Sequence, residues 1–110
     1  MITTTLYGKT TEKSGELIDY NLTLEYYIVT EPLCAEYSDL LRYGVKIKMI
    51  AEFSDGTCDE EAQEIRDIFY RENDAKKFIN LLLENKVTPT HLREVVEEYI
   101  SNSLKISKRV

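Results

Sequence analysis

The stretch Asn73–Leu104, NDAKKFINLLLENKVTPTHLREVVEEYISNSL, decides the fold, because its pattern is typical of two amphipathic helices joined by a short turn. Apolar side chains recur on one face of each predicted helix at a spacing of three and four residues. They are Ala75, Phe78, Ile79, Leu82 and Leu83 in the first helix and Leu92, Val95, Val96, Tyr99, Ile100 and Leu104 in the second. Helices this short are unstable alone, so the sequence predicts another layer beneath them.

The joint between the two helices carries start and stop signals. Asn85 is expected to end the first helix, since asparagine tolerates the left-handed conformation that many helix ends need. Thr88 is expected to cap the second helix through its hydroxyl, with Pro89 at the first helical position. Asn73 or Asp74 is expected to cap the first helix.

The part of the chain before the helices alternates apolar and polar side chains, which indicates β-strands. Strands are predicted at residues 2–9, 19–30 and 43–53, and the first two are expected to form an antiparallel hairpin. The third has the most regular apolar face. Its members are Tyr43, Val45, Ile47, Met49, Ala51 and Phe53.

The connections between these strands are predicted from turn and breaker residues. Residues 10–16 are polar and contain Ser14-Gly15, which indicates a turn. Pro32 is expected to end the second strand, because proline cannot donate to a sheet ladder. Residues 33–42 are interpreted as a loop with one helical turn.

Residues 59–70 admit two interpretations. A strand is favoured, because Asp55-Gly56 predicts a tight turn directly after the third strand. A bulge or longer loop near residues 55–59 would then pair Ile65 with Ile47 and Phe69 with Tyr43. The competing interpretation is a helix from Asp59, since its early acidic residues suit a helix N-terminus.

Strands first and helices last predict an α+β fold. We expect an antiparallel sheet of about four strands, in two hairpins, with the C-terminal helices packed on one face. The 110 residues suffice for one domain, residues 1–110. Residues 1–72 would be mostly strands, 73–104 the helical hairpin and 105–110 a frayed tail.

Composition narrows the function classes. The net charge of −6 disfavours bulk electrostatic binding to nucleic acid or anionic membranes. The sequence has no apolar run of membrane-spanning length and no apolar segment typical of a secretion signal. Cys34 and Cys58 lack the C-x-x-C spacing of a redox pair, so a cytoplasmic protein with reduced thiols is expected.

The sequence contains no recognisable catalytic set. His91 is the only histidine and has no evident nucleophile or acid partner. Five acidic residues gather in one stretch, but their spacing is not that of an EF-hand, and whether they bind a cation stays open. They are Asp55, Asp59, Glu60, Glu61 and Glu64. No catalytic, cofactor-binding or metal site is predicted, and the protein is not expected to be an enzyme.

Two surfaces are candidates for binding a partner, the outer face of the predicted sheet and the helix pair. Tyr26 and Tyr27 are adjacent, so they must point to opposite faces of their strand. The outer face would hold Tyr27, Val29 and Tyr7, either as a partner surface or as ordinary cover of the sheet.

The helix pair also resembles a helix-turn-helix in the length of its joint. A basic patch near the joint would favour nucleic acid, whereas acidic residues on the second helix would repel phosphates. The basic residues are Lys76, Lys77, Lys86 and Arg93, and the acidic residues are Glu94, Glu97 and Glu98.

Two stretches, YGVKI at 43–47 and NKVTPTHLREVVEEYI at 85–100, resemble a small uncharacterised family, a domain of unknown function found in clostridia-type Firmicutes. The similarity covers about the last two thirds of the chain. It implies a small cytoplasmic bacterial protein, and it supplies no activity and no functional residues.

The leading hypothesis is a small non-enzymatic interaction or regulatory module that binds a protein partner or self-associates through its sheet. One alternative is a small-ligand-binding protein with a pocket between sheet and helices, containing His91 or Arg93. Another is a weak nucleic-acid binder that uses the helix pair.

Overall fold

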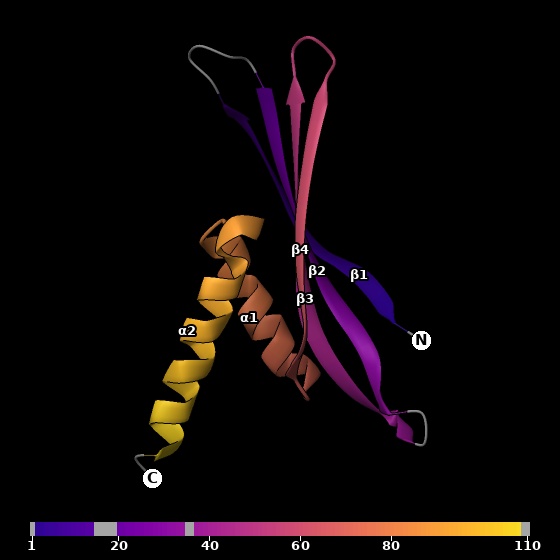
Figure 1. Ribbon diagram of the computed structural model, residues 1–110, viewed down its shortest axis with the longest axis vertical. Coiled ribbons are helices and arrows are strands. Elements are labelled where there is room, and N and C mark those ends of the chain that lie inside the picture. The colour runs from indigo at the N-terminus through magenta and orange to yellow at the C-terminus, as the bar shows by residue number, and fades with distance from the viewer. Residues whose placement is uncertain (1, 15–19, 35–36, 109–110) are drawn as a thin grey trace.

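The computed structural model describes residues 2–14, 20–34 and 37–108 and contains a four-stranded antiparallel sheet followed by two helices (Figure 1). The elements are β1 (Thr3–Ser14), β2 (Tyr20–Cys34), β3 (Tyr37–Phe53), β4 (Cys58–Phe69), α1 (Glu72–Glu84) and α2 (Pro89–Lys108). The strand order β1-β2-β3-β4 makes each strand the neighbour of the next. Both helices lie on one face of the sheet, which confirms the predicted α+β architecture.

The strands extend further than predicted. β1 continues through residues 10–14, β2 passes through Pro32, and β3 begins at Tyr37, so the expected loops at 10–16 and 33–42 are wrong wherever the chain is described. The outermost pair between β1 and β2 is Thr3–Thr30. At Pro32, β2 therefore has only β3 beside it, and the β2–β3 ladder shifts register there. A proline at such an irregular edge position removes no essential bond. Residues 15–19 and 35–36 lie outside the described residues.

The fourth segment is a strand, as favoured, and the turn before it is confirmed. The Phe53 N–H donates to the Thr57 carbonyl at 2.9 Å, and Gly56 has a φ of +92°. The predicted pairing of Phe69 with Tyr43 is confirmed.

The bulge lies at the other end of β4 from the predicted position. Ile65 pairs with Val45 and not with Ile47, because the loop at 54–57 sets Glu52 opposite Cys58. The register then shifts between Tyr43 and Val45, where Asp67 takes a φ of 61°.

The core lies between the sheet and the helices, and the predicted apolar faces supply it. Its buried members are Leu24, Tyr26, Ile28, Tyr43, Val45, Ile47, Ala75, Phe78, Ile79, Leu82, Val87, Leu92 and Val96. Leu83, Val95 and Tyr99 are partly buried against it. Ile100 is 40% exposed, contrary to the prediction, because α2 projects away from the sheet toward its C-terminal end (Figure 1). The side chain of Leu104 lies outside the described residues.

The helix ends correct two details of the predicted joint. α1 begins after Arg71, which makes no side-chain capping bond, so neither Asn73 nor Asp74 is its cap. Asn85 does end α1, but with a φ of −95°, and Lys86 takes the left-handed conformation at φ 50°.

The backbone around Lys86 forms a Schellman motif. The Lys86 N–H donates to the Leu83 carbonyl at 3.2 Å, and the Val87 N–H donates to the Leu82 carbonyl at 3.1 Å. These bonds satisfy the last carbonyls of α1 and fix the direction in which the chain leaves it.

Lys86→Gly is expected to stabilise the protein by about 1 kcal/mol, because glycine adopts a positive φ without a steric penalty. The gain is reduced slightly by the loss of the exposed Lys86–Glu12 ion pair. Thermal unfolding followed by circular dichroism measures it. Lys86→Ala is the matched control, since it removes the ion pair without relieving the backbone. A Lys86→Gly protein no more stable than Lys86→Ala would contradict the assignment of strain to Lys86.

Tyr26 ties the sheet to the helix joint. Its ring is fully buried, and its hydroxyl donates to the Val87 carbonyl at 2.9 Å. Burial raises the pKa of Tyr26 from its ordinary value of 10.0 to about 12.

Tyr26→Phe is expected to cost about 1–3 kcal/mol at neutral pH, because the buried Val87 carbonyl loses its donor. Between pH 10 and 12 the unfolded chain releases the tyrosine proton before the folded protein does. The wild type should therefore lose roughly 2 kcal/mol over this range, and the phenylalanine variant should lack that contribution. Urea unfolding at pH 7, 10 and 12 measures both effects. A difference between the two proteins that stays constant with pH would contradict the raised pKa.

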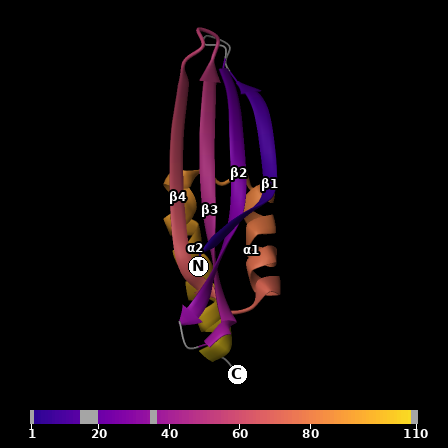
Figure 2. The same cartoon turned by 90° about the vertical axis from the view of Figure 1, so that its right-hand side faces the viewer.

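The sheet is much longer than the helices that cover it. The 17 residues of β3 span about 50 Å, whereas the 13 residues of α1 span about 20 Å. One end of the sheet therefore projects beyond both helices, as Figures 1 and 2 show. Near this end the rings of Tyr20 and Phe53 lie 5.7 Å apart on the helix side of the sheet.

Candidate functional site

His91 lies in the first turn of α2, where the sequence placed it. It is exposed, and its Nδ1 lies 3.0 Å from the hydroxyl of Thr88. Pro89 is the first helical residue, as predicted, but the Thr88 hydroxyl meets the histidine ring in place of the expected backbone N–H. The contact fits a local role at the helix start.

The acidic stretch is divided by the alternation of β4. Asp59 and Glu61 share the helix side of the sheet with the β3 core residues opposite them, whereas Glu60 and Glu64 point to the other side. Asp55 accepts hydrogen bonds from Thr57, which lower the pKa of its carboxyl. Across the described ranges, no three histidine, cysteine or acidic side chains stand close enough to hold a metal ion.

The structure shows the surroundings of Cys58 and of two basic residues of the helix pair, Lys76 and Lys86. Cys58 is exposed and carries a free thiol at the start of β4, while the side chain of Cys34 is not described. Lys76 is paired with Glu72 at 3.1 Å, and Lys86 is paired with Glu12.

Within residues 2–14, 20–34 and 37–108, no helix is long and apolar enough to cross a membrane.

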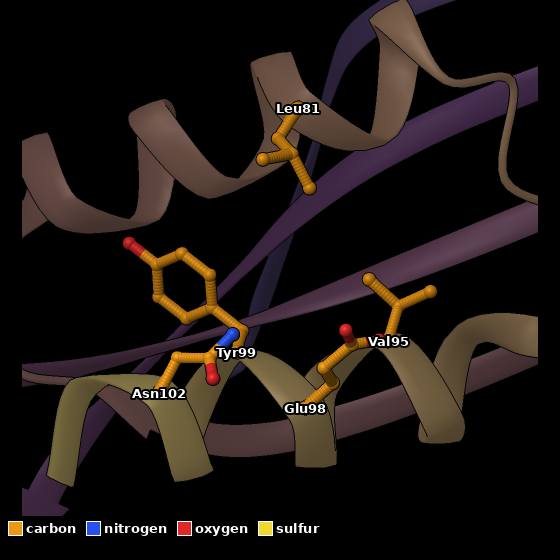
Figure 3. Close-up of a pocket in the computed structure, with 5 residues that line it drawn as sticks. All are labelled: Leu81, Val95, Glu98, Tyr99 and Asn102. Carbon is orange, nitrogen blue, oxygen red and sulfur yellow. The ribbon is translucent and has the colours of Figure 1, made fainter. Parts of the chain in front are cut away.

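A small cavity of about 200 Å³ opens between α1 and α2 (Figure 3). Leu81 points into it from α1, and Val95 and Tyr99 point toward it from α2, beside Glu98 and Asn102. The pocket expected from the sequence lay between the sheet and the helices and contained His91 or Arg93. The observed cavity lies instead between the two helices, and neither of these residues lines it.

The outer face of the sheet, away from the helices, holds Tyr27 as predicted. Tyr27 is half-buried, its hydroxyl donates to Glu25 at 3.0 Å, and the Lys46 amine lies 6.0 Å from its ring centre. Desolvation raises the pKa of Tyr27, with a further contribution from Glu25. Leu6 pairs with Tyr27 across the ladder and is half exposed.

Two other members of the predicted outer face lie elsewhere. Tyr7 packs against the core on the helix side, where the β1 register shift next to it places its ring. Val29 is on the outer face but fully buried, flanked in the ladder by Thr4 and Gly44. The exposed part of this face is therefore smaller than the sequence predicted.

An ion-pair cluster on the outer face was missed by sequence reasoning. The buried carboxylate of Glu31 lies 3.2 Å from Arg42 Nε and 3.8 Å from Arg66 Nη1, and Arg42 also reaches Asp67 at 3.3 Å. Its members come from three strands, and only the unusual placement of charged residues in β-strands could have signalled it. The opposite charges compensate each other, which indicates a structural role.

The two long edges of the sheet, β1 and β4, are the remaining candidate surface (Figure 2). In the described part of the chain neither edge is paired with a further strand. An open edge presents unpaired backbone N–H and carbonyl groups, which can pair with another chain.

Comparison with known proteins identifies a family. Residues 4–102 match the family of unknown function DUF6514. The chain belongs to this family. The DUF6514 match includes nearly all of the sheet and most of the helix pair, so it extends well beyond the two thirds expected from sequence. No curated protein and no solved structure matches the chain.

Proposed function

We propose that this DUF6514 protein is a small non-enzymatic interaction module that self-associates through its sheet. The observation that carries the proposal is the projecting end of the sheet, which the helices leave uncovered on the side that elsewhere forms the core. Leu22, Ala51 and Phe53 lie there outside the core cluster and are only partly buried. Partly buried apolar and aromatic side chains beside open strand edges are typical of surfaces that bind other proteins.

A second candidate function is the binding of a small ligand between α1 and α2. The cavity favours it, because an acid and an amide, Glu98 and Asn102, stand beside apolar walls. Its volume of about 200 Å³ falls below the range of roughly 300–1,000 Å³ that is usual for ligand sites. A thermal-shift screen with metabolites tests this candidate, and Val95→Trp, which fills the cavity, should abolish any shift.

Nucleic-acid binding through the helix pair is the weakest candidate. Glu94, Glu97 and Glu98 are exposed on α2, and they would repel a phosphate backbone. A salt-sensitive mobility shift with DNA or RNA would revive it.

The proposed setting is the bacterial cytoplasm. The exposed free thiol of Cys58 supports it, since such thiols persist in reducing compartments. The sequence resemblance supports a bacterial source.

Two differently tagged copies, co-expressed in one cell, test self-association directly. Capture of one copy should recover the other, and failure to recover it would count against the proposal. The same capture from lysate of the source organism, followed by mass spectrometry, asks whether another protein binds. Loss of such a protein with Tyr27→Ala would place its contact on the outer face.

A further inference from the structure

The two edges of the sheet differ sharply in charge. β4 carries five acidic residues and one arginine in 12 positions. They are Asp59, Glu60, Glu61, Glu64, Asp67 and Arg66. The bulge at Asp67 also bends this edge. Acidic side chains and a bulge are known protections against edge-to-edge pairing, so β4 is unsuited to meet its own copy.

β1 has a register shift of its own, between Leu6 and Gly8, but residues 8–12 beyond it pair regularly with β2 and carry no net charge. Between Thr3 and Glu12 it carries five threonines and only two charged residues, Lys9 and Glu12, which have opposite signs. Threonine favours strand pairing, because its branched side chain fits a pleated surface. In a chain of net charge −6, this near-neutral edge is where two copies can approach with least repulsion.

We propose that β1 pairs antiparallel with β1 of a second copy, across a two-fold axis at Thr10, so that the two sheets join into one. This inference rests on the proposed self-association and names the surface and the partner. The projecting end supplies the room, because beyond Gly8, where Leu83 packs closely on β1, the strand runs toward the uncovered part of the sheet.

The register follows from the faces of β1. Gly8, Thr10 and Glu12 share the helix side with the core residues of β2 opposite them, whereas Lys9 and Thr11 share the outer side. A two-fold axis perpendicular to the sheet keeps both helix layers on one side and pairs only residues of the same face.

Centring the pair on Thr10 avoids repulsion between directly opposed charges. Thr10 then faces Thr10 of the second copy, Lys9 faces Thr11, and Gly8 faces Glu12. A shift of one residue toward the N-terminus would place Lys9 opposite its own copy, and like charges directly opposite destabilise a strand pair.

Charge substitutions at position 10 test the pairing by sedimentation. Thr10→Lys and Thr10→Glu should each weaken the dimer at least about tenfold, since two like charges would face each other. An equimolar mixture of the two variants should restore it, because lysine would then face glutamate. Ala62→Lys, at an exposed position of the β4 edge, is the matched control and should associate like the wild type.

The outcomes separate this inference from the proposed function. A wild-type dimer that Thr10→Lys leaves intact, or that Ala62→Lys weakens equally, would overturn β1 pairing while self-association stands. A wild type that remains monomeric would overturn both.

Hydrogen exchange of the wild type provides a second test, which does not depend on whether a substituted protein folds. Amides of residues 8–12 should exchange more slowly at high protein concentration, whereas those of residues 58–69 should not change. Equal rates at both concentrations for residues 8–12 would overturn the inference.

Discussion

Leu82→Asp is expected to abolish the folded state at neutral pH. Leu82 is fully buried in the core between α1 and the sheet, and its backbone carbonyl also belongs to the turn that ends α1. A carboxylate buried there without a partner costs several kcal/mol. Since a domain of this size is stabilised by only about 5–15 kcal/mol, little stability would remain. Circular dichroism should detect no cooperative thermal transition.

Leu81→Asp is the matched control for this prediction. Leu81 is the preceding residue of α1, but it is 38% exposed and faces the cavity beside α2. Its replacement should change the free energy of unfolding by about 1 kcal/mol or less. A Leu82→Asp protein that melts near the wild-type temperature would contradict the assignment of the buried helix face.

Gly44→Ala is expected to destabilise the protein by about 3 kcal/mol or more, at the upper end of the usual penalty for overpacking. A Cβ atom on Gly44 would stand 2.3 Å from the Ile65 carbonyl oxygen and 2.6 Å from the Arg66 Cα. Both atoms are backbone, so a side-chain rotation cannot relieve the clash. The bulge in β4 presses the chain against β3 at this position, and it would have to move. Urea unfolding measures the loss.

Gly8→Ala separates this clash from the general effect of replacing a glycine within a strand. Its Cβ would also be too close to a neighbour, at 2.5 Å, but that neighbour is the Leu83 Cδ1 at the end of a flexible side chain. We expect Gly8→Ala to cost clearly less than Gly44→Ala. Equal losses at the two sites would argue against the close backbone approach in the bulge.

The elements predicted best from the sequence are those with long, regular patterns. The alternation from Tyr43 to Met49 and the helical spacing from Ala75 to Leu82 both correspond to faces packed in the core. Pro89 likewise marked the start of α2, because a proline at the first helical position loses no hydrogen bond.

The errors arose where distant parts of the chain decide a local outcome. Pro32 lies within a strand, because β1 no longer pairs with β2 there, and no local signal conveys where a neighbouring strand stops. The bulge was placed at the wrong end of β4, although a mid-strand glycine, Gly44, is a known sign of close backbone approach.

The candidate surface could be anticipated only in part. Alternation correctly separated Tyr26 from Tyr27, but it could not reveal that Val29 is buried on the outer face. The extra length of the strands relative to the helices, which leaves one end of the sheet uncovered, became evident only from the structure.

The central claim is that two copies associate through the sheet, and sedimentation equilibrium of the untagged wild type over a wide concentration range tests it most directly. The account predicts an apparent mass that rises with concentration to twice that of the chain. A mass that stays at that of a single chain up to the highest soluble concentration would contradict it.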